Sequence, residues 1–263
     1  MGRRILVASG KGGVGKTTIS AGLGEALARL GASVCVVDLD FNFNNLDVVS
    51  NVEAKVVYTL GDYLENRCHL KQTLVEFKRG LNLFFVFSSS ECENGENAPK
   101  LEEAIKKLSD VFDYVILDSP AGLGGGFYVG AKVASEVLLV VCPFLSSIKD
   151  ASALKSVIRL TNNIPIKLVI NKIRGDLVIL DKMLGVSQIE GLLNLECLGV
   201  VPECDEFLIS GNTKSVLDAS DEINRYIMQI AENLHLNKNI RLDYCAKYKG
   251  LFGKIRAKLK KGA

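Results

Sequence analysis

The sequence predicts an α/β fold in which helices cover both faces of a mostly parallel sheet. Three observations lead to this class. Apolar strand-like runs alternate with amphipathic stretches along most of the 263 residues. The runs are continuous in Val, Ile and Leu, which is typical of strands buried on both faces. A glycine-rich octet at residues 10–17 joins the first run to the first amphipathic stretch.

Seven strands and four helices are predicted in order. The strand-like runs share continuous apolar character and cover about 3–9, 33–38, 81–87, 114–118, 137–142, 167–171 and 198–201. The stretches with helical spacing of apolar residues cover 17–30, 99–108, 147–160 and 220–234. No internal repeat or low-complexity linker interrupts this order, so we predict one domain, residues 1–240, and an appended amphipathic tail, residues 241–263.

Composition excludes several classes of protein. Hydrophobic residues make up 48% of the chain, yet no uninterrupted apolar run approaches the ~20 residues of a membrane span. The N-terminus enters the first strand without a signal-peptide pattern, so we expect a cytosolic protein. The seven cysteines are scattered, and the two histidines are far apart. This pattern favours reduced, buried thiols and gives little support to a metal cluster, a zinc site or a histidine-based site.

The octet is Gly10-Lys11-Gly12-Gly13-Val14-Gly15-Lys16-Thr17, the pattern of a phosphate-binding loop (P-loop) between a strand and a helix. Successive backbone N–H groups of such a turn form an anion nest at the positive end of the helix. We expect Lys16 to contact the β- and γ-phosphates of a nucleoside triphosphate and the Thr17 hydroxyl to ligate Mg²⁺. Nucleotide contacts are assigned to all eight residues and to Thr18.

Carboxylates follow two predicted strands, at the edge where an α/β sheet binds ligands. Asp38 and Asp40 end the second run, and carboxylates placed there can order metal-bound water or position an attacking water. Asp118 follows four apolar residues, which is the Walker B arrangement, and is predicted to hold Mg²⁺ through water. The glycines of segment 122–126 are expected to let it move.

Lys11 adds a second lysine to the loop, and such a loop resembles that of the MinD/ParA family of ATPases. The resemblance to the MinD group of this family spans nearly the whole chain. It includes the segments 45–47, 56–58, 118–122, 146–147 with Asp150, and 199–203. The chain departs from that group at Asn44, where Arg is typical, and at Leu123-Gly124, where Ile-Glu is usual.

The resemblance implies roles for four catalytic residues. Lys11 would reach across a dimer to the partner's nucleotide, so that ATP joins two subunits. Asp40 would position or activate the hydrolytic water, and Asp38 would support the metal and a nucleotide-sensing switch. Lys16 would act on the phosphates as the loop pattern already predicts.

The same resemblance implies where the base is held. Asn171 follows the sixth run, and its amide offers a donor and an acceptor, which suits a purine edge. The family uses an asparagine after this strand for adenine. Pro202-Glu203 resembles the family's second base-contacting loop.

The tail carries a distinct charge. Residues 241–263 hold eight Lys or Arg and one acid, a net of +7, so residues 1–240 carry +2 − 7 = −5. On a helical wheel one apolar stripe about 100° wide forms among the cations. Its members are Tyr248, Leu251, Phe252, Ile255 and Leu259. One such tail should bind an anionic membrane marginally and two linked tails far better.

These features predict an ATP-dependent, dimerising ATPase that uses ATP and Mg²⁺ and sits peripherally on the inner face of the cell membrane when ATP-bound. By resemblance it would regulate septum placement, with slow turnover stimulated by a partner. Its partners would be a MinC-like division inhibitor and possibly a MinE-like activator, and no specific nucleic acid is expected. The alternatives are a FlhG-like regulator of flagellar number and placement, a ParA-type DNA partition ATPase, and a nucleotide-gated scaffold with negligible turnover.

Overall fold

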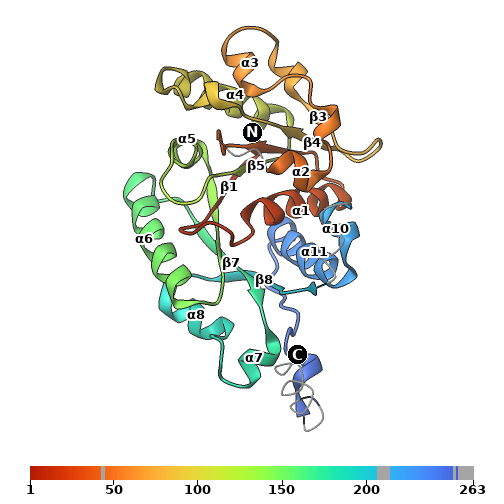
Figure 1. Ribbon diagram of the computed structural model, residues 1–263, viewed down its shortest axis with the longest axis vertical. Coiled ribbons are helices and arrows are strands. Elements are labelled where there is room, and N and C mark those ends of the chain that lie inside the picture. Colours follow the sequence, from red (N-terminus) through yellow and green to blue (C-terminus); the bar gives the residue numbers. More distant parts are fainter. Residues whose placement is uncertain (43–44, 206–213, 251–252, 254–263) are drawn as a thin grey trace.

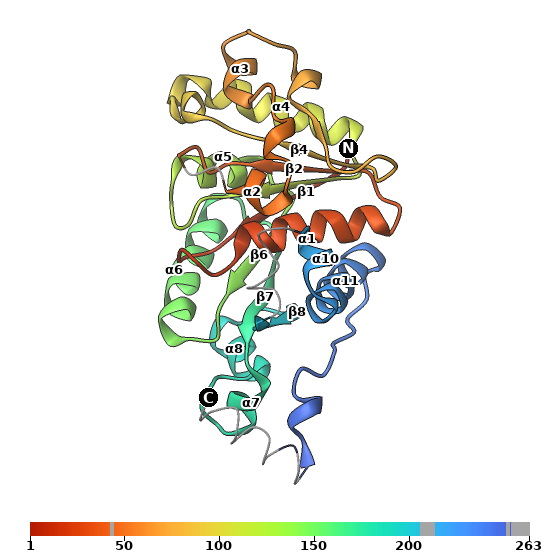
Figure 2. The same cartoon turned by 45° about the vertical axis from the view of Figure 1, so that its right-hand side comes forward.

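The computed structural model describes residues 1–42, 45–205, 214–250 and 253. Its centre is an eight-stranded sheet with the order β3-β4-β2-β5-β1-β6-β7-β8. Every neighbouring pair is parallel except β3 and β4. Helices α1, α10 and α11 lie together on one side of this sheet and α4, α5 and α6 on the other (Figures 1 and 2). The predicted α/β class is confirmed.

The strands reproduce the seven predicted runs within a few residues and add one short strand, β3. Their bounds are β1 Arg3–Ala8, β2 Val34–Asp38, β3 Val75–Glu76, β4 Leu83–Val86, β5 Tyr114–Asp118, β6 Glu136–Val141, β7 Ile166–Ile173 and β8 Cys197–Pro202. Strands β2, β5, β6 and β8 are buried at every position, as the continuous apolar runs predict. Strand β3 has two residues, too few to show a period in the sequence.

The helices include the four predicted ones, α1, α4, α6 and α11. The α-helices are α1 Lys16–Arg29, α2 Leu46–Ser50, α3 Leu60–Leu64, α4 Ala98–Val111, α5 Gly125–Val133, α6 Leu145–Thr161, α7 Gly175–Ile179, α8 Val186–Leu193, α10 Val216–Ala219 and α11 Asp221–Leu236. Short 3₁₀ turns are η1 Glu53–Lys55, η2 Leu70–Thr73, η3 Ser90–Glu93, η4 Gly95–Asn97 and η5 Ala246–Tyr248. In the described part of the chain, none of the helices could cross a membrane.

The glycines after Asp118 have a packing role that the sequence did not predict. Gly125 and Gly126 form the first turn of α5. A Cβ atom at Gly126 would lie 1.9 Å from the carbonyl oxygen of Leu39, just after β2. Glycine at this position therefore lets α5 approach the chain segment that carries Asp38 and Asp40.

Strand β8 forms one edge of the sheet and contains a bulge. Its pairing with β7 skips Leu198, since Leu168 is opposite Cys197 and Val169 is opposite Gly199. The carbonyl of Leu198 accepts a hydrogen bond of 2.9 Å from Nδ2 of the fully buried Asn233 in α11. Asn233 also binds Ile240 N–H and C=O, so the chain after α11 is fastened beside this edge.

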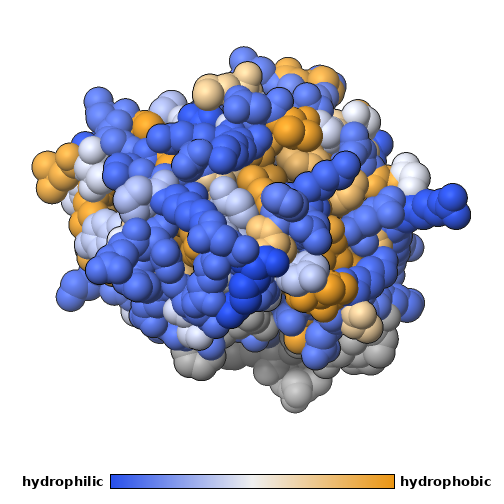
Figure 3. Space-filling view, turned by 90° about the horizontal axis from the view of Figure 1, so that it is seen from above, coloured by the Kyte–Doolittle hydropathy of each residue, from blue (hydrophilic) through white to orange (hydrophobic). Residues whose placement is uncertain are grey.

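The first part of the predicted tail packs on the body. Arg241 forms an ion pair of 2.7 Å with Glu190 of α8, and Tyr244 and Tyr248 lie against Gly175 at the start of α7. These contacts extend the packed body as far as Tyr248. The division of the chain at residue 240 stays a prediction. The α3–α4 end of the molecule is mainly hydrophilic with apolar residues interspersed (Figure 3).

Candidate functional site

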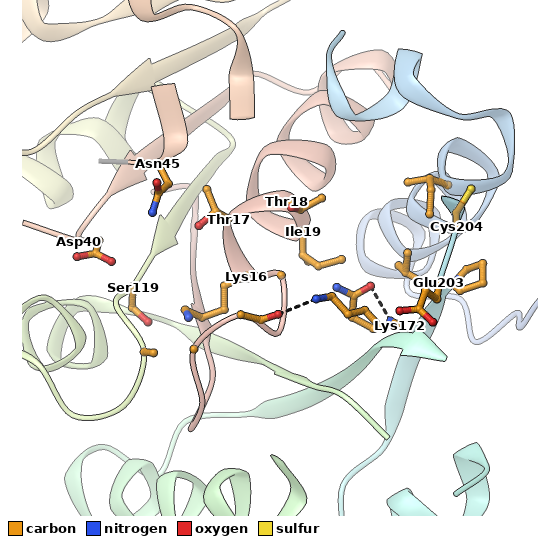
Figure 4. A pocket seen from close by; sticks show the side chains of 18 residues that line it. Lys16, Thr17, Thr18, Ile19, Asp40, Asn45, Ser119, Lys172, Glu203 and Cys204 are labelled. Atoms are coloured by element: carbon orange, nitrogen blue, oxygen red, sulfur yellow. Dashed lines mark hydrogen bonds between the residues drawn. The ribbon is translucent and has the colours of Figure 1, made fainter. Parts of the chain in front are cut away.

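A cavity of about 550 Å³ opens at the carboxyl ends of β2, β7 and β8, where the P-loop enters α1 (Figure 4). It joins chain segments that are distant in the sequence. The residues that line it are Gly12, Gly13, Gly15, Lys16, Thr17, Thr18, Ile19, Asp40, Asn45, Ser119, Ala121, Asn171, Lys172, Val201, Pro202, Glu203, Cys204 and Ile223. Most of the predicted nucleotide-binding residues are therefore brought together.

The P-loop has the backbone that an anion nest needs. Gly13 has φ of 74° and Gly15 φ of 92°, left-handed values that favour glycine. Packing adds a second demand, because a Cβ at Gly15 would lie 2.3 Å from Asn171 Nδ2. At Gly10 a Cβ would lie 2.4 Å from the carbonyl carbon of Asp150. The loop is thus fitted closely to α6 and β7.

Lys16 lies within the site, whereas Lys11 lies at its rim. Lys16 is 8% exposed and donates a hydrogen bond of 3.0 Å to Ser9 Oγ. Burial lowers the pKa of its ammonium, and the charges of Asp118 and Asp40 oppose that shift. Lys11 is exposed, and its Nζ is 3.4 Å from Ser146 Oγ at the start of α6. Of these two lysines, Lys16 lines the cavity and Lys11 does not.

Asp118 is at the end of β5, next to the start of α1. Its side chain accepts a hydrogen bond of 2.8 Å from Ser20 Oγ and another from Thr17. Burial raises the pKa of Asp118 to about 6, and these two hydrogen bonds oppose the shift. Asp118 and Thr17, the two predicted Mg²⁺ residues, are in contact.

Asp38 is 1% exposed at the end of β2. Burial, followed by the charge of Asp118, raises its pKa to about 8. Its Oδ1 accepts a hydrogen bond of 2.9 Å from the Asp40 N–H, but Oδ2 has no hydrogen-bond partner among the described residues. A buried carboxylate oxygen left open beside Asp118 fits a site that takes up a hydrated cation.

The protein residues do not enclose a metal by themselves. Across the described ranges there is no group of three or more His, Cys, Asp or Glu side chains that could hold one. The hydroxyl of Thr17 with the carboxylates of Asp118 and Asp38 suits Mg²⁺, which keeps several waters and takes further ligands from substrate phosphates. The residues therefore fit Mg²⁺ bound together with a nucleotide.

The predicted base-contacting residues line the opposite end of the cavity. Pro202 ends β8 and Glu203 follows it, and the Glu203 N–H donates to the Ile173 carbonyl at 3.1 Å. Asn171 is 7% exposed, and its amide makes one donor and one acceptor contact with the protein. Its Nδ2 donates to the Val14 carbonyl at 2.8 Å, and its Oδ1 accepts from the Lys172 N–H at 2.9 Å.

Lys172, for which no sequence motif predicts a role, lines the same cavity. Its Nζ donates a hydrogen bond of 2.8 Å to the Gly13 carbonyl. Ser119 also lines the site, and its hydroxyl donates to the Val7 carbonyl at 3.0 Å. The sequence could have indicated a role for Lys172 only because it directly follows Asn171. Nothing in the sequence shows where the Lys172 side chain points.

The tail residues predicted to meet a membrane are placed only in part. Tyr248 is 5% exposed, and a Cβ at Gly175 would lie 3.2 Å from its ring. In this structure Tyr248 belongs to the packed body. Leu251, Phe252, Ile255 and Leu259 lie outside the described residues, as does Asn44.

Comparison with known proteins supports a nucleotide site. The model of the CobQ/CobB/MinD/ParA nucleotide-binding domain matches residues 5–216. A septum site-determining protein MinD from Synechocystis is 35% identical, over 98% of this chain and 99% of that protein.

Solved structures share the fold. A chain in the MinC:MinD cell division protein complex of Aquifex aeolicus is 31% identical over 92% of this chain and 98% of that chain, with a TM-score of 0.84. The septum site-determining protein MinD of Pyrococcus horikoshii, solved as a complex with Mg-ADP, is 24% identical over 89% of this chain and 96% of that chain. Its TM-score of 0.77 shows a common fold.

Proposed function

The chain belongs to the CobQ/CobB/MinD/ParA family of nucleotide-binding domains, and from this premise we propose that it is an ATPase that helps to place the division septum. The role in division rests on the likeness, over nearly the full length, to septum site-determining relatives. ATP and Mg²⁺ are the ligands that the cavity and its carboxylates fit best.

The contrast between Lys11 and Lys16 carries the proposal that ATP joins two subunits. Lys16 is buried at its own cavity, while Lys11 is exposed beside α6, with its Nζ 3.4 Å from Ser146 Oγ. An exposed lysine at the rim of a phosphate site is available to a nucleotide held by a second copy of the chain. Dimerisation would therefore follow from occupation of both sites by ATP.

Hydrolysis would depend on Lys16 of the P-loop and on the carboxylates at the ends of β2 and β5. Lys16 would hold the phosphates, Asp40 would position the attacking water, and Asp38 would support the metal and the nucleotide-sensing switch. Bound Mg²⁺ would supply charge neutralisation for the phosphates, held by Thr17 and, through water, Asp118. We expect ATP turnover to be slow until a partner protein stimulates it. A MinC-like division inhibitor would bind the protein, and a MinE-like protein is a possible activator of hydrolysis.

Membrane binding would come from the tail beyond Tyr248. Two tails on one dimer would bind an anionic surface far better than one, because the second binds at high effective concentration. Hydrolysis would return the protein to single tails and release it. The ATP-bound protein would then be peripheral on the inner face of the cell membrane.

Co-sedimentation tests this cycle. The full chain with ATP should pellet with vesicles rich in anionic lipid and stay in the supernatant with ADP. The chain ending at Tyr248 should still dimerise with ATP but no longer pellet. Binding to DNA and not to vesicles would refute the proposal in favour of a partition ATPase, and equal vesicle binding without the tail would refute the membrane mechanism.

A further inference from the structure

Lys172 has an unusual backbone conformation for a lysine inside a strand. Its φ is 57°, in the left-handed region that residues other than glycine seldom occupy. It lies at an irregularity of β7, since Asn171 is opposite Val201 whereas Ile173 is opposite Pro202. Bulges of this kind redirect a side chain, often beside a functional site.

The bulge brings two consecutive side chains to one loop. In a regular strand successive side chains point to opposite faces, so Asn171 and Lys172 could not both reach the P-loop. Here Asn171 Nδ2 donates to the Val14 carbonyl and Lys172 Nζ to the Gly13 carbonyl, each at 2.8 Å. Two adjacent peptide groups of the loop are therefore held from β7.

Holding a carbonyl also sets the direction of the N–H in the same peptide. A trans peptide is planar, with its C=O and N–H pointing in opposite directions, and no described peptide bond is cis. The Gly13 carbonyl shares its plane with the Val14 N–H, and the Val14 carbonyl with the Gly15 N–H. Drawing both carbonyls toward β7 turns both N–H groups away from β7.

The phosphate side of the loop is the side that faces away from Lys172. In Figure 4 Lys172 and Glu203 lie on one side of the P-loop, and Lys16, Ser119 and Asp40 lie on the other. N–H groups turned away from β7 point toward Lys16, where an anion nest has to be. Asn171 comes so close that a Cβ at Gly15 would be 2.3 Å from its Nδ2, so Gly15 is also what permits this contact.

We propose that Asn171 and Lys172 are positioning residues that hold the peptides of Gly13 and Val14 with their N–H groups aimed at phosphate. This peptide clamp organises the loop for the phosphates of any nucleotide. It rests on the phosphate ligand of the proposed function and is independent of dimerisation, hydrolysis and the membrane.

Binding of three probes to the full-length protein tests the clamp. Dissociation constants for ATP, GTP and inorganic tripolyphosphate, each with Mg²⁺, would be measured by calorimetry. Lys172→Met removes the donor and keeps the length of the side chain, and Lys172→Arg restores a donor. Lys167→Met is the matched control, a lysine on the same strand whose side chain is outside the cavity.

The clamp predicts that Lys172→Met weakens all three probes by the same factor, about five- to tenfold for one lost hydrogen bond to the loop. Lys172→Arg should recover most of this affinity, and Lys167→Met should bind like the unsubstituted protein. Asn171→Ala should weaken tripolyphosphate as well as ATP. Combined with Lys172→Met, its effect should be smaller than the product of the two single effects, because the two contacts act on one loop.

Two results would overturn the clamp. Loss of ATP affinity with unchanged tripolyphosphate affinity would show that these residues act on the base and not on the phosphate loop. An effect of Lys172→Met that disappears between about 0.05 M and about 0.5 M KCl would make Lys172 a long-range charge, since only exposed charge–charge attraction is screened. If Lys172→Met weakens tripolyphosphate binding and Lys172→Arg restores it, but ATP causes no dimerisation, the proposed function fails and the clamp stands.

Discussion

Asp38 and Asp118 lie directly opposite each other at the ends of the neighbouring parallel strands β2 and β5, and both are almost fully buried. Burial raises both pKa values, to about 8 for Asp38 and about 6 for Asp118, and the charge of Asp118 adds to the shift of Asp38. The nucleotide-free protein therefore keeps a proton on this pair at neutral pH.

The first prediction concerns stability and pH. A carboxyl group whose pKa is raised by folding favours the folded state fully below its unfolded pKa of about 4, and this contribution is lost as pH rises through the folded value. Without nucleotide or Mg²⁺, the contribution of Asp38 to the unfolding free energy should thus fall between about pH 4 and pH 8. Since a pKa change of one corresponds to about 1.4 kcal/mol, Asp38→Asn should stabilise the protein at pH 8 by up to about 5 kcal/mol and have little effect at pH 4.

Urea denaturation at several pH values measures this difference. Comparing Asp38→Asn with the unsubstituted protein at each pH cancels the contributions of other titrating groups. A difference in unfolding free energy that stays constant from pH 4 to pH 8 would show that Asp38 titrates normally.

The second prediction separates the two lysines of the P-loop. Lys16→Ala should weaken ATP binding by at least about 100-fold, since it removes a buried charge from the phosphate site. Lys11→Ala should change the affinity of the monomer for ATP by less than about threefold, because the side chain is exposed. It should nevertheless abolish ATP-dependent dimerisation in analytical ultracentrifugation. Normal ATP-dependent dimers of Lys11→Ala would remove the argument for a nucleotide shared between subunits.

The third prediction concerns a buried carboxylate away from the cavity. Glu25 in α1 is 2% exposed and accepts hydrogen bonds from Arg29, Ser215 and the Leu217 N–H. Glu25→Ala should lower the unfolding free energy by about 2–4 kcal/mol, because it leaves buried donors without an acceptor. The matched control is Glu103→Ala, which breaks an exposed pair with Lys107 and should leave the unfolding free energy nearly unchanged. Equal costs in urea denaturation would contradict the role of burial.

The fourth prediction compares two helical glycines. Gly126→Ala would place a Cβ 1.9 Å from the Leu39 carbonyl oxygen and should cost at least about 2 kcal/mol in thermal or urea unfolding. Gly191 in α8 has no atom within 4 Å of the position of an added Cβ. Gly191→Ala should therefore stabilise the protein by about 0.5–1 kcal/mol through helix propensity. A tolerated Gly126→Ala would mean that α5 does not need this close approach.

Much of the fold could be predicted because its signals are local. Burial on both faces leaves a continuous apolar run, and each predicted run became a strand. Helix α5 escaped prediction because its first turn contains Gly125 and Gly126, which by propensity favour a loop. The reason for Gly126 lies in Leu39, nearly ninety residues away in the sequence.

The site was predictable to the extent that its residues follow strands or form a contiguous motif. The parallel sheet brings the ends of β2, β5, β7 and β8 to one edge, so Asp38, Asp118, Asn171 and Glu203 converge near the P-loop. The hydrogen-bond partners of Asn171 were not predictable, because they depend on the bulge at Lys172. The packing of Tyr248 depends on Gly175, which the apolar stripe of the tail does not reveal.

The bulge at Leu198 and its contact with Asn233 affect how copies of this protein can associate. An open sheet edge is a template on which another molecule can add a strand, and irregular or fastened edges resist such aggregation. Strand β8 is irregular at Leu198, whose carbonyl already has a donor in Asn233. Association by continuing the sheet from one molecule to the next is thereby disfavoured at this edge.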